Sequence, residues 1–402
     1  MRLKKVLIPV IFLLTLGACL PYSTGAPAPA QPATERPVVV GASLALSGGF
    51  ADTAKEVRAG YELWVEDVNS RGGLLGRKVE LKIYDDEGKP DKAAQLLERL
   101  ITVDRVDLVL GGYPGTTVAA QAPVAEKYKY VYIGMGAHSP SFEQGYQYFF
   151  GGPPLLGSWY PLAFMDLVKA VRQGTVEGPQ LNTVALLFMN NIIGQDARKG
   201  TLDFIAKNMP DFKVVVDELY DSPLANADPL IARARQAQAD VVMLGGNPAE
   251  NALMLRTLRV QGYQPKAVFV YIGPHSLPWV KEIGELGELV FTGFTGDAFT
   301  PKAKAVDQMY RSRYGQPIDL YILTGYNYGY VLEAGVNGAK SLDNTRIRDW
   351  LKTNEVDTPL GKLRFDQRGL PQPISVAYQI QGGQVVAVWP RGPETKPPIF
   401  RR

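Results

Sequence analysis

Two histidines and one cysteine are the most chemically versatile side chains in this sequence of 402 residues. The histidines are His138 and His275, and an imidazole ring donates or accepts hydrogen bonds and can become charged near neutral pH. A metal site built on them would need a third ligand, such as Asp52 or Glu250, but these residues lack the spacing of a metal-ligand motif. We therefore expect no metal and no cofactor.

Catalytic motifs are missing from the sequence. It contains no Gly-x-Ser-x-Gly elbow and no nucleotide-phosphate loop, and the two histidines have no acidic residue at a fixed local spacing. Asp85 and Asp86 suggest a metal pair at a strand end, but loop solvation and turn capping are the favoured roles. The sequence predicts a protein that is not an enzyme, although a catalytic site assembled only in three dimensions stays open.

An export signal is predicted at the N-terminus. Three basic residues within the first five precede the apolar run 6–16, which is too short for a membrane-spanning helix. Residues 16–19, Leu-Gly-Ala-Cys, resemble the lipobox of bacterial lipoproteins, in which cleavage precedes a cysteine that then carries the lipid. Because Cys19 is the only cysteine, we expect a lipid anchor there and no disulfide within the chain; a chance cysteine is the alternative.

The rest of the chain has the composition of an ordinary globular protein, with 46% apolar and 21% charged residues. The formal net charge of +3 resides in residues 1–19, so the remainder is neutral and gives no support to nucleic-acid binding. Residues 22–37 are rich in Ala, Pro, Ser and Thr and predict an extended tether. About 365 residues follow, which is enough for two lobes.

Strand-like and helix-like segments alternate from residue 38 onward, a pattern typical of a parallel sheet with helices on both faces. Strands are expected at 38–46, 79–84, 106–110, 130–133, 184–188, 214–218, 241–244 and 267–271. Helices are expected around 57–68 and at 91–100, 117–128, 195–207, 229–237 and 250–261. The predicted fold class is α/β, with two doubly wound Rossmann-like lobes and a ligand cleft between them, beyond the carboxyl ends of the strands.

Short segments along both halves carry a resemblance to a known family. They are Leu46-Ser47-Gly48, the glycine-rich run 69–78, 84–86, 123–126, Gly194, 244–246, Gly273-Pro274 and Gly325-Tyr326-Asn327. In this order they resemble the type I periplasmic solute-binding proteins, specifically the branched-chain amino acid and amide binding group of ABC transporters. The resemblance implies a monomeric, extracytoplasmic binding component of an ABC importer, with a small-molecule ligand and a membrane permease as partners.

The alternation and the resemblance together divide the chain. The expected divisions are 1–19 signal peptide with lipobox, 20–37 tether, 38–155 plus 291–373 lobe 1, 156–290 plus 374–392 lobe 2, and 393–402 tail. Hinges are expected near 151–157, 290–297 and 371–375, so that the lobes close around a bound ligand.

The resemblance also implies which residues contact the ligand. Gly115 stands at the family's usual serine position, and His275 stands at the acidic residue that pairs with an α-ammonium group in amino acid binders. Ile193 and Asn247 stand where the family has aromatic side chains. The expected contacts are Phe50, Thr53, Tyr113, Gly115, Thr116, Gly136, Ala137, His138, Ile193, Asn247, His275 and Tyr321.

Histidine in place of that acid removes the charge partner of an ammonium ion, and an unpaired buried charge is costly. This disfavours a free branched-chain amino acid and favours an aromatic or aliphatic carboxylate, an amide or another uncharged metabolite. Two alternatives stay open. Each histidine is simply satisfied within a loop, or the protein is a sensor that reports its ligand to a receptor.

Overall fold

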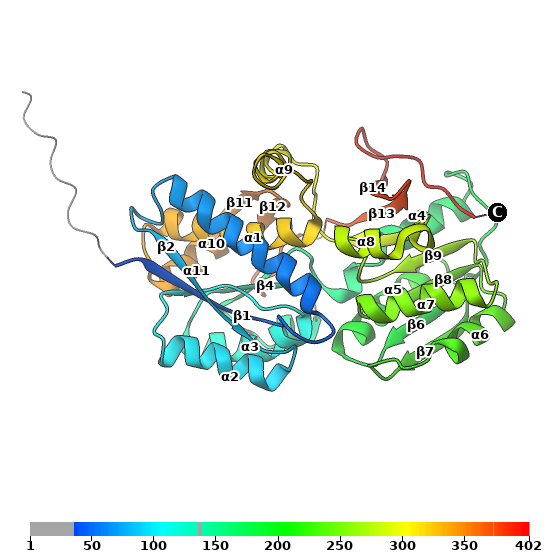
Figure 1. Ribbon diagram of the computed structural model, residues 1–402, viewed down its shortest axis with the longest axis horizontal. Coiled ribbons are helices and arrows are strands. Elements are labelled where there is room, and N and C mark those ends of the chain that lie inside the picture. The colour runs from blue at the N-terminus through cyan, green and yellow to red at the C-terminus, as the bar shows by residue number, and fades with distance from the viewer. Residues whose placement is uncertain (1–35, 136–138, 373, 402) are drawn as a thin grey trace, which may run out of the picture. The chain divides into compact units, whose positions relative to one another are not determined.

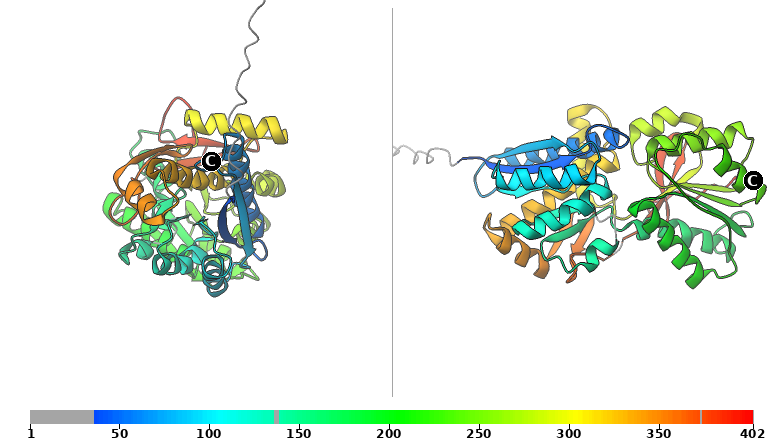
Figure 2. Two further views of the ribbon diagram at one scale, coloured as in Figure 1. Left: turned by 90° about the vertical axis from the view of Figure 1, so that its left-hand side faces the viewer. Right: turned by 90° about the horizontal axis from the view of Figure 1, so that it is seen from below.

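The computed structural model describes residues 36–135, 139–372 and 374–401. Residues 36–402 form one compact unit, in which two groups of strands are each covered by helices (Figures 1 and 2). We call the group around β1 the first lobe and the group around β6 the second lobe. Within the described residues, no helix is both long and apolar enough to cross a bilayer.

The first lobe is built on parallel strands. β1 lies between β2 and β3, and β4 pairs with β5. The amide of Gly111, after β3, donates to the carbonyl oxygen of Ile133 in β4 at 3.0 Å, which joins the two sets. The strands are β1 (Val38–Leu44), β2 (Val79–Asp85), β3 (Leu108–Val109), β4 (Tyr132–Met135) and β5 (Phe149–Gly152).

Helices α1 and α10 of the first lobe pack closely because glycines meet at their crossing. A Cβ atom on Gly60 of α1 would lie 2.1 Å from the Ile322 carbonyl oxygen, and one on Gly325 of α10 would lie 2.1 Å from that of Val57. The segment Gly325-Tyr326-Asn327 is thus part of a helix contact. The helices of this lobe are α1 (Ala51–Ser70), α2 (Pro90–Thr102), α3 (Gly115–Tyr128), α10 (Leu320–Ala339) and α11 (Asn344–Thr353).

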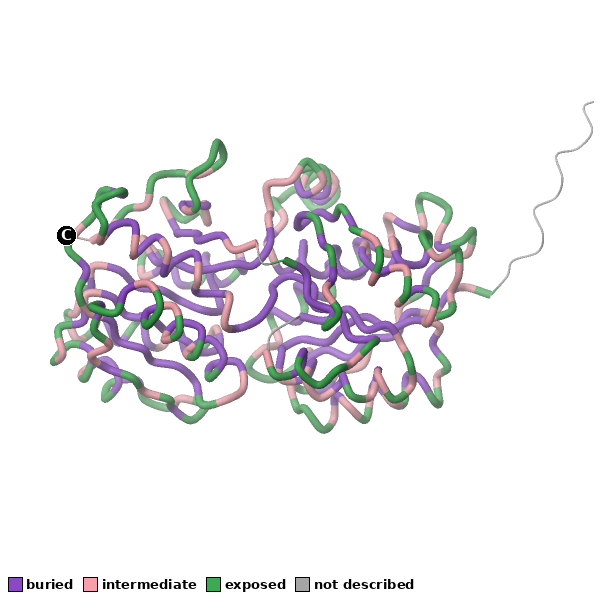
Figure 3. The backbone as a smooth tube through the Cα atoms, turned by 180° about the vertical axis from the view of Figure 1, so that it is seen from behind, coloured by how far each residue is buried: buried purple, intermediate pink, exposed green. Residues whose placement is uncertain are grey.

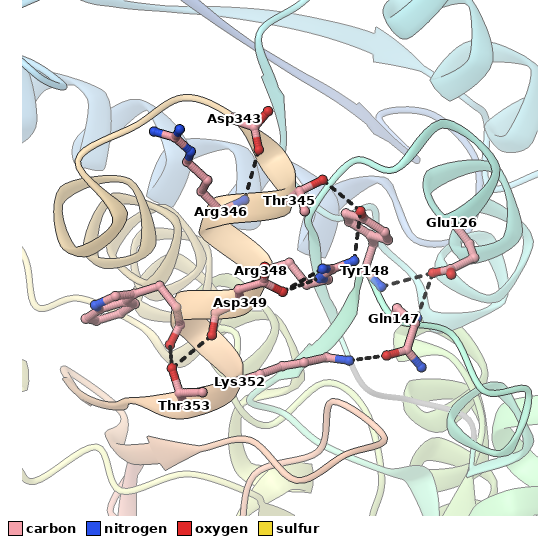
Figure 4. A network of polar contacts seen from close by, with 11 residues as sticks. Glu126, Gln147, Tyr148, Asp343, Thr345, Arg346, Arg348, Asp349, Lys352 and Thr353 are labelled. Atoms are coloured by element: carbon pink, nitrogen blue, oxygen red, sulfur yellow. Dashed lines mark hydrogen bonds and ion pairs between the residues drawn. The ribbon is translucent and has the colours of Figure 1, made fainter.

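A polar network attaches α11 to the edge of the first lobe (Figure 4). Arg348 donates from Nη1 to the Tyr148 hydroxyl at 2.9 Å, and that hydroxyl lies 2.9 Å from Oγ1 of Thr345. The Glu126 carboxylate accepts from the backbone amides of Gln147 and Tyr148 at 2.7 and 2.9 Å. Late chain segments therefore complete a lobe that begins at residue 38.

The second lobe contains a seven-stranded sheet of order β14-β13-β10-β9-β8-β6-β7. Strands β10 to β7 are parallel, and β13 and β14 are antiparallel additions at one edge. The strands are β6 (Thr183–Met189), β7 (Lys213–Tyr220), β8 (Val241–Gly245), β9 (Ala267–Val270), β10 (Val290–Phe294), β13 (Val376–Gln381) and β14 (Gln384–Trp389). The helices are α4 (Leu162–Arg172), α5 (Ile192–Asn208), α6 (Asp228–Gln236), α7 (Pro248–Val260) and α8 (Leu277–Ile283).

The chain passes between the lobes three times: after β5, after β10 and before β13. Because β10 pairs with β9 and β13, the second crossing follows Phe294, whereas the expected lobe boundary stood at 290/291. Helix α9 (Pro301–Tyr314) and the hairpin of β11 (Glu355–Thr358) and β12 (Gly361–Arg364) lie between that crossing and the third.

Burial explains why the central strands read as continuous apolar runs. Figure 3 shows buried backbone through the middle of each lobe, and every residue of β8 is buried.

The Asp85-Asp86 pair stabilises the turn after β2. Asp86 accepts from Ser43 Oγ at 2.8 Å and from the Gly88 amide at 2.9 Å, while Asp85 accepts from the Glu87 amide at 2.9 Å.

Candidate functional site

A pocket lies where the carboxyl ends of strands from both lobes meet. Its cavity volume is about 30 Å³, room for only a few water molecules, so in this structure the pocket is nearly filled by its own side chains. The first lobe contributes residues that follow β3 and β5, the last residue of β4 and Tyr321 of α10, and the second lobe contributes residues that follow β6 and β9. The lining residues are Tyr113, Pro114, Gly115, Met135, Pro154, Leu155, Tyr160, Ile193, Tyr271, Ile272 and Tyr321.

Four tyrosines dominate the pocket wall. The rings of Tyr113 and Tyr321 meet edge to face at 5.8 Å, and those of Tyr160 and Tyr271 lie 4.5 Å apart. All four are buried, and burial raises the pKa of each hydroxyl above its ordinary value. They therefore remain neutral at physiological pH and can donate hydrogen bonds to a ligand.

Among the described residues of the pocket wall, these phenols are the only ionisable groups. Among the described lining residues there is no Asp, Glu, Lys, Arg or His. The rest of the wall consists of aliphatic side chains, prolines and the backbone of Gly115. Gly115 is also the first residue of α3, which brings the N–H groups of a helix start to the pocket edge.

Four of the expected contacts line this pocket: Tyr113, Gly115, Ile193 and Tyr321. Gly136, Ala137 and His138 lie outside the described residues. Phe50 and Thr53 stand one layer behind Tyr113. The Phe50 ring lies 6.1 Å from the Tyr113 ring, and Thr53 on α1 hydrogen-bonds to the Tyr113 side chain.

Two other expected contacts, Thr116 and Asn247, are not among the residues that line this pocket. Thr116 lines a separate surface hollow with residues of α3 and α5. Asn247 is the N-cap of α7, where its side chain accepts from the Glu250 amide at 3.0 Å while the Glu250 side chain accepts from the Asn247 amide. This reciprocal capping occupies both side chains with the helix end.

His275 lies behind the pocket wall and not in it. Its Nε2 is 2.7 Å from the Gly293 carbonyl oxygen, which only accepts, so Nε2 carries the proton of a neutral ring. Burial lowers the pKa of His275 to about 4, although the Gly293 contact opposes that shift. The ring packs edge-on against the pocket residues Tyr160 and Tyr321, at 6.1 and 6.4 Å.

The two carboxylates considered as further metal ligands have other partners. Asp52 is exposed and pairs with Lys55 at 3.3 Å. Glu250 accepts from the Leu224 amide at 3.0 Å and from the Tyr220 hydroxyl at 3.2 Å. Within the described ranges, no three His, Cys, Asp or Glu side chains form a group that could hold a metal ion.

Sequence reasoning missed most of the second-lobe wall. Tyr271 and Ile272 directly follow β9, so the rule that ligands bind beyond the carboxyl ends of parallel strands would have found them. Tyr160 stands in the crossing segment between β5 and α4, where the sequence carries no periodic signal. Its place in the wall depends on how the crossing folds.

A family model described as periplasmic binding protein matches residues 37–384. The chain belongs to the periplasmic binding protein family. This confirms the resemblance seen in the sequence, and with it an extracytoplasmic, solute-binding role. The family's binding proteins are transport components and not enzymes, in agreement with the expectation from the sequence.

Curated relatives of this family align over most of the chain. The chain is 25% identical over 373 residues to the Leu/Ile/Val-binding protein homolog 7 of Brucella abortus, covering 88% of this chain and 91% of that protein. It is 24% identical over 340 residues to the leucine-, isoleucine-, valine-, threonine- and alanine-binding protein of Pseudomonas aeruginosa, with 81% and 84% covered.

Solved structures of periplasmic binding proteins show the same fold. A branched-chain amino acid binding protein from Streptococcus pneumoniae, in complex with isoleucine, has a TM-score of 0.74 at 19% identity and covers 88% of this chain and 100% of that one. A solute-binding protein from R. palustris, in complex with benzoate, has a TM-score of 0.73 at 18% identity, with 88% and 95% covered. The predicted α/β fold with two parallel-sheet lobes is confirmed.

Proposed function

We propose that this protein is the substrate-binding component of an ABC importer, and that its ligand has an apolar body and a hydrogen-bond-accepting polar end. The observation that carries the ligand class is the pocket wall, with four neutral tyrosine hydroxyls and no carboxylate among its described residues. A free amino acid would bring an ammonium group that this wall leaves unpaired. Aromatic or aliphatic carboxylates and amides bring acceptors that the phenols can satisfy.

The relatives support a range of ligands within one fold. The Pseudomonas aeruginosa relative is named for amino acids, and the R. palustris structure holds benzoate. The pocket of this chain supports a ligand of the second kind better, because His275 is neutral and stands behind the wall. Closure of both lobes on such a ligand would present one shape to a permease.

The lipid anchor is a second part of the proposal. Cys19, after the short apolar run 6–16, would carry the lipid and hold the binding unit at the membrane through the tether 22–37. Mass spectrometry of the protein purified from membranes tests this assignment. A mature chain that begins at Cys19 and carries the mass of acyl groups is expected, and an unmodified Cys19 would contradict it.

Binding is best tested by thermal shift with two ligand panels. One panel holds leucine, isoleucine and valine, and the other holds benzoate, hydroxybenzoates, straight-chain carboxylates and their amides. A ligand at about 100 times its Kd stabilises the native state by about 2.7 kcal/mol, which raises the melting temperature. We expect the melting temperature to rise with ligands of the second panel only.

Tyr271→Phe and Tyr314→Phe are a matched pair of variants for this test. Tyr271 lines the pocket, whereas Tyr314 stands on α9 with 47% of its surface exposed. Loss of one hydroxyl that bonds the ligand should weaken binding about tenfold, and the Tyr314 variant should bind like the wild type. A shift with leucine, equal in all three proteins, would contradict the proposed ligand class.

A further inference from the structure

A pair of buried carboxyl groups lies between the lobes, beside the pocket and outside its wall. Glu56 stands on α1 and Asp319 caps the start of α10, and both belong to the first lobe. Glu56 is 8% exposed and Asp319 is 5% exposed. Acidic side chains are seldom buried to this extent without a cationic partner.

Both carboxyls bond to the second lobe at the same place. Ser276, the N-cap of α8, donates from Oγ to Oε1 of Glu56 at 2.5 Å. The backbone amide of the next residue, Leu277, is a hydrogen-bond partner of Asp319. Asp319 also accepts from the Ile322 amide of its own helix at 2.8 Å. Two adjacent residues of the second lobe therefore hold two carboxyls of the first.

The remaining oxygen of Glu56 has no partner among the described residues. Its Oε2 is buried and makes no hydrogen bond. An ionised carboxylate with a buried, unpaired oxygen is unfavourable, whereas a protonated carboxylic acid carries no charge to desolvate. The geometry at Oε2 is thus better suited to the protonated acid.

Burial and neighbouring charges also favour the protonated form of the two carboxyls. Burial is the largest influence on the pKa of Glu56 and raises it to about 8, and the nearby charges of Asp319 and Asp52 raise it further, while the Ser276 hydrogen bond opposes the shift. Burial raises the pKa of Asp319 to about 7, against the backbone amides of Ile322, Tyr321 and Leu277. Neither carboxyl has a Lys or Arg among these influences.

Apart from Asp52, whose charge raises the pKa of Glu56, the described titratable side chains around the pair are neutral. Burial and the charge of Glu56 raise the pKa values of Tyr113 and Tyr321, so both phenols stay protonated. His275 precedes Ser276 in the chain and is uncharged because burial lowers its pKa to about 4. Among the described residues, no cation is thus named beside the pair that would compensate two ionised carboxylates. A proton is the simplest species that does so.

We propose that Glu56 and Asp319 form a proton-binding site that couples proton uptake to closure of the two lobes. When the lobes close, Ser276 and Leu277 cover the pair, and the pair takes up a proton. When the lobes separate, both carboxyls reach water and the proton is released. Closure therefore weakens as the pH rises. The site lies outside the pocket wall, so the coupling holds whatever the ligand is.

The direction and range of the effect follow from linkage. The ordinary pKa values are 4.5 for Glu56 and 3.8 for Asp319, and the covered pair has values of about 8 and about 7. Between these limits the closed form holds more protons than the open form. The ratio of closed to open molecules should fall up to about tenfold for each pH unit and each coupled proton, from about pH 5 to about pH 8.

Spin-label distances measure this ratio without any ligand. The full-length chain with Cys19→Ser has no cysteine, so Ser47→Cys and Ala225→Cys place one label on an exposed residue of each lobe. Distance distributions at pH 5, 6.5, 8 and 9 report the closed and open populations. We expect the closed population to fall with pH and to level off above pH 8.

Variants test whether Glu56 and Asp319 cause the pH dependence of lobe closure. Glu56→Gln keeps an oxygen for Ser276 and cannot ionise, so the pH response should fall to half or less of the wild-type slope. Asp319→Asn keeps a residue that can cap α10 and should also reduce the change of the closed population with pH. Glu62→Gln is the control, because Glu62 is exposed on the same helix and pairs with Arg58 at 2.8 Å.

Two results would overturn the proposal. One is a wild-type closed population that is constant from pH 5 to pH 9. The other is a Glu56→Gln protein that is folded by circular dichroism and keeps the full wild-type slope. Because no ligand is present, either result leaves the proposed transport function untouched, and failure of the ligand panels leaves the proton site untouched.

Discussion

The aromatic pocket and the carboxyl pair are both buried between the lobes, and burial makes both uncharged by opposite routes. Behind the pocket wall, desolvation lowers the pKa of His275 to about 4, so the ring is neutral because it has lost a proton. At the carboxyl pair, desolvation raises the pKa of Glu56 to about 8, so that acid is neutral because it keeps one. The two regions therefore respond to pH with opposite sign.

This contrast has a physical lesson for binding. A pocket wall without charged side chains among its described residues suits a ligand with an apolar body, because no ionised side chain of that wall has to lose its hydration when the ligand binds. His275 is a base and Glu56 is an acid, but burial in the protein interior favours the uncharged form of both side chains near neutral pH. Variants that disturb one region and not the other separate their roles.

The largest effect is expected from Tyr321→Ala. This change removes a ring that lines the pocket and packs against Tyr113 at 5.8 Å and His275 at 6.4 Å. The cavity should lower the free energy of unfolding by about 3–5 kcal/mol. Chemical denaturation measures this loss, and Tyr321→Phe, which keeps the ring, should lose less than about 1.5 kcal/mol. Equal losses in the two variants would show that the ring does not support the wall.

The acid side of the stability profile should depend on His275. Its folded pKa of about 4 lies below the ordinary 6.5, so the neutral ring favours folding above pH 6.5 and this contribution is lost as the pH falls toward 4. The loss is about 3 kcal/mol, since each pKa unit corresponds to about 1.4 kcal/mol. Denaturation of wild type and His275→Gln from pH 7 to pH 4 measures it. Parallel profiles would contradict a buried neutral histidine.

Glu56 should produce the opposite slope. Its folded pKa lies above the ordinary 4.5, so the protonated acid favours folding at low pH, and this contribution is lost as the pH rises toward about 8. Because the charge of Asp319 also influences the pKa of Glu56, the two groups titrate as an interacting pair, and we expect Glu56→Gln to gain about 2 kcal/mol over the wild type across that range. The comparison uses unfolding free energies at pH 5 and pH 8. A gap between the proteins that stays constant would rule out a proton on Glu56.

The smallest effect is expected at Asn247, which the sequence placed in the pocket and the structure places at a helix start. Asn247→Ala removes the reciprocal cap of α7 and should cost about 1 kcal/mol of stability. Ligand affinity should stay within about twofold of wild type, as measured by calorimetry with any ligand found in the panels. An affinity loss of tenfold or more at unchanged stability would return Asn247 to the binding site.

Regular elements were predictable where one signal dominated. The strand at 184–188 and the helix at 195–207 match β6 and α5, because a parallel strand buried on both faces is continuously apolar and the following helix is periodic. The antiparallel strands β13 and β14 and the helices α9 and α11 were not assigned from the sequence. The strands β13 and β14 join the second lobe, and α11 joins the first, through contacts with residues far away in the sequence and not through a local pattern.

The site was predictable only in part for the same reason. Tyr113 and Gly115 follow a strand at the start of a helix, and that position alone brings them to the cleft. His275 also follows a strand, three residues after the pocket residue Ile272, yet its ring points to the Gly293 carbonyl of β10. Spacing along the chain locates a loop, but it does not determine which way a side chain in that loop points.

The sequence by itself determined the family, the two α/β lobes and the pocket segments that follow predicted strands, because burial patterns and turns are local properties. The tertiary structure alone decided which side chains form the wall, why His275 is neutral, and that Glu56 and Asp319 meet Ser276 and Leu277 across the lobes. These features arise from residues as far apart as 220 positions, and their charge depends on water exclusion, which no single segment can specify.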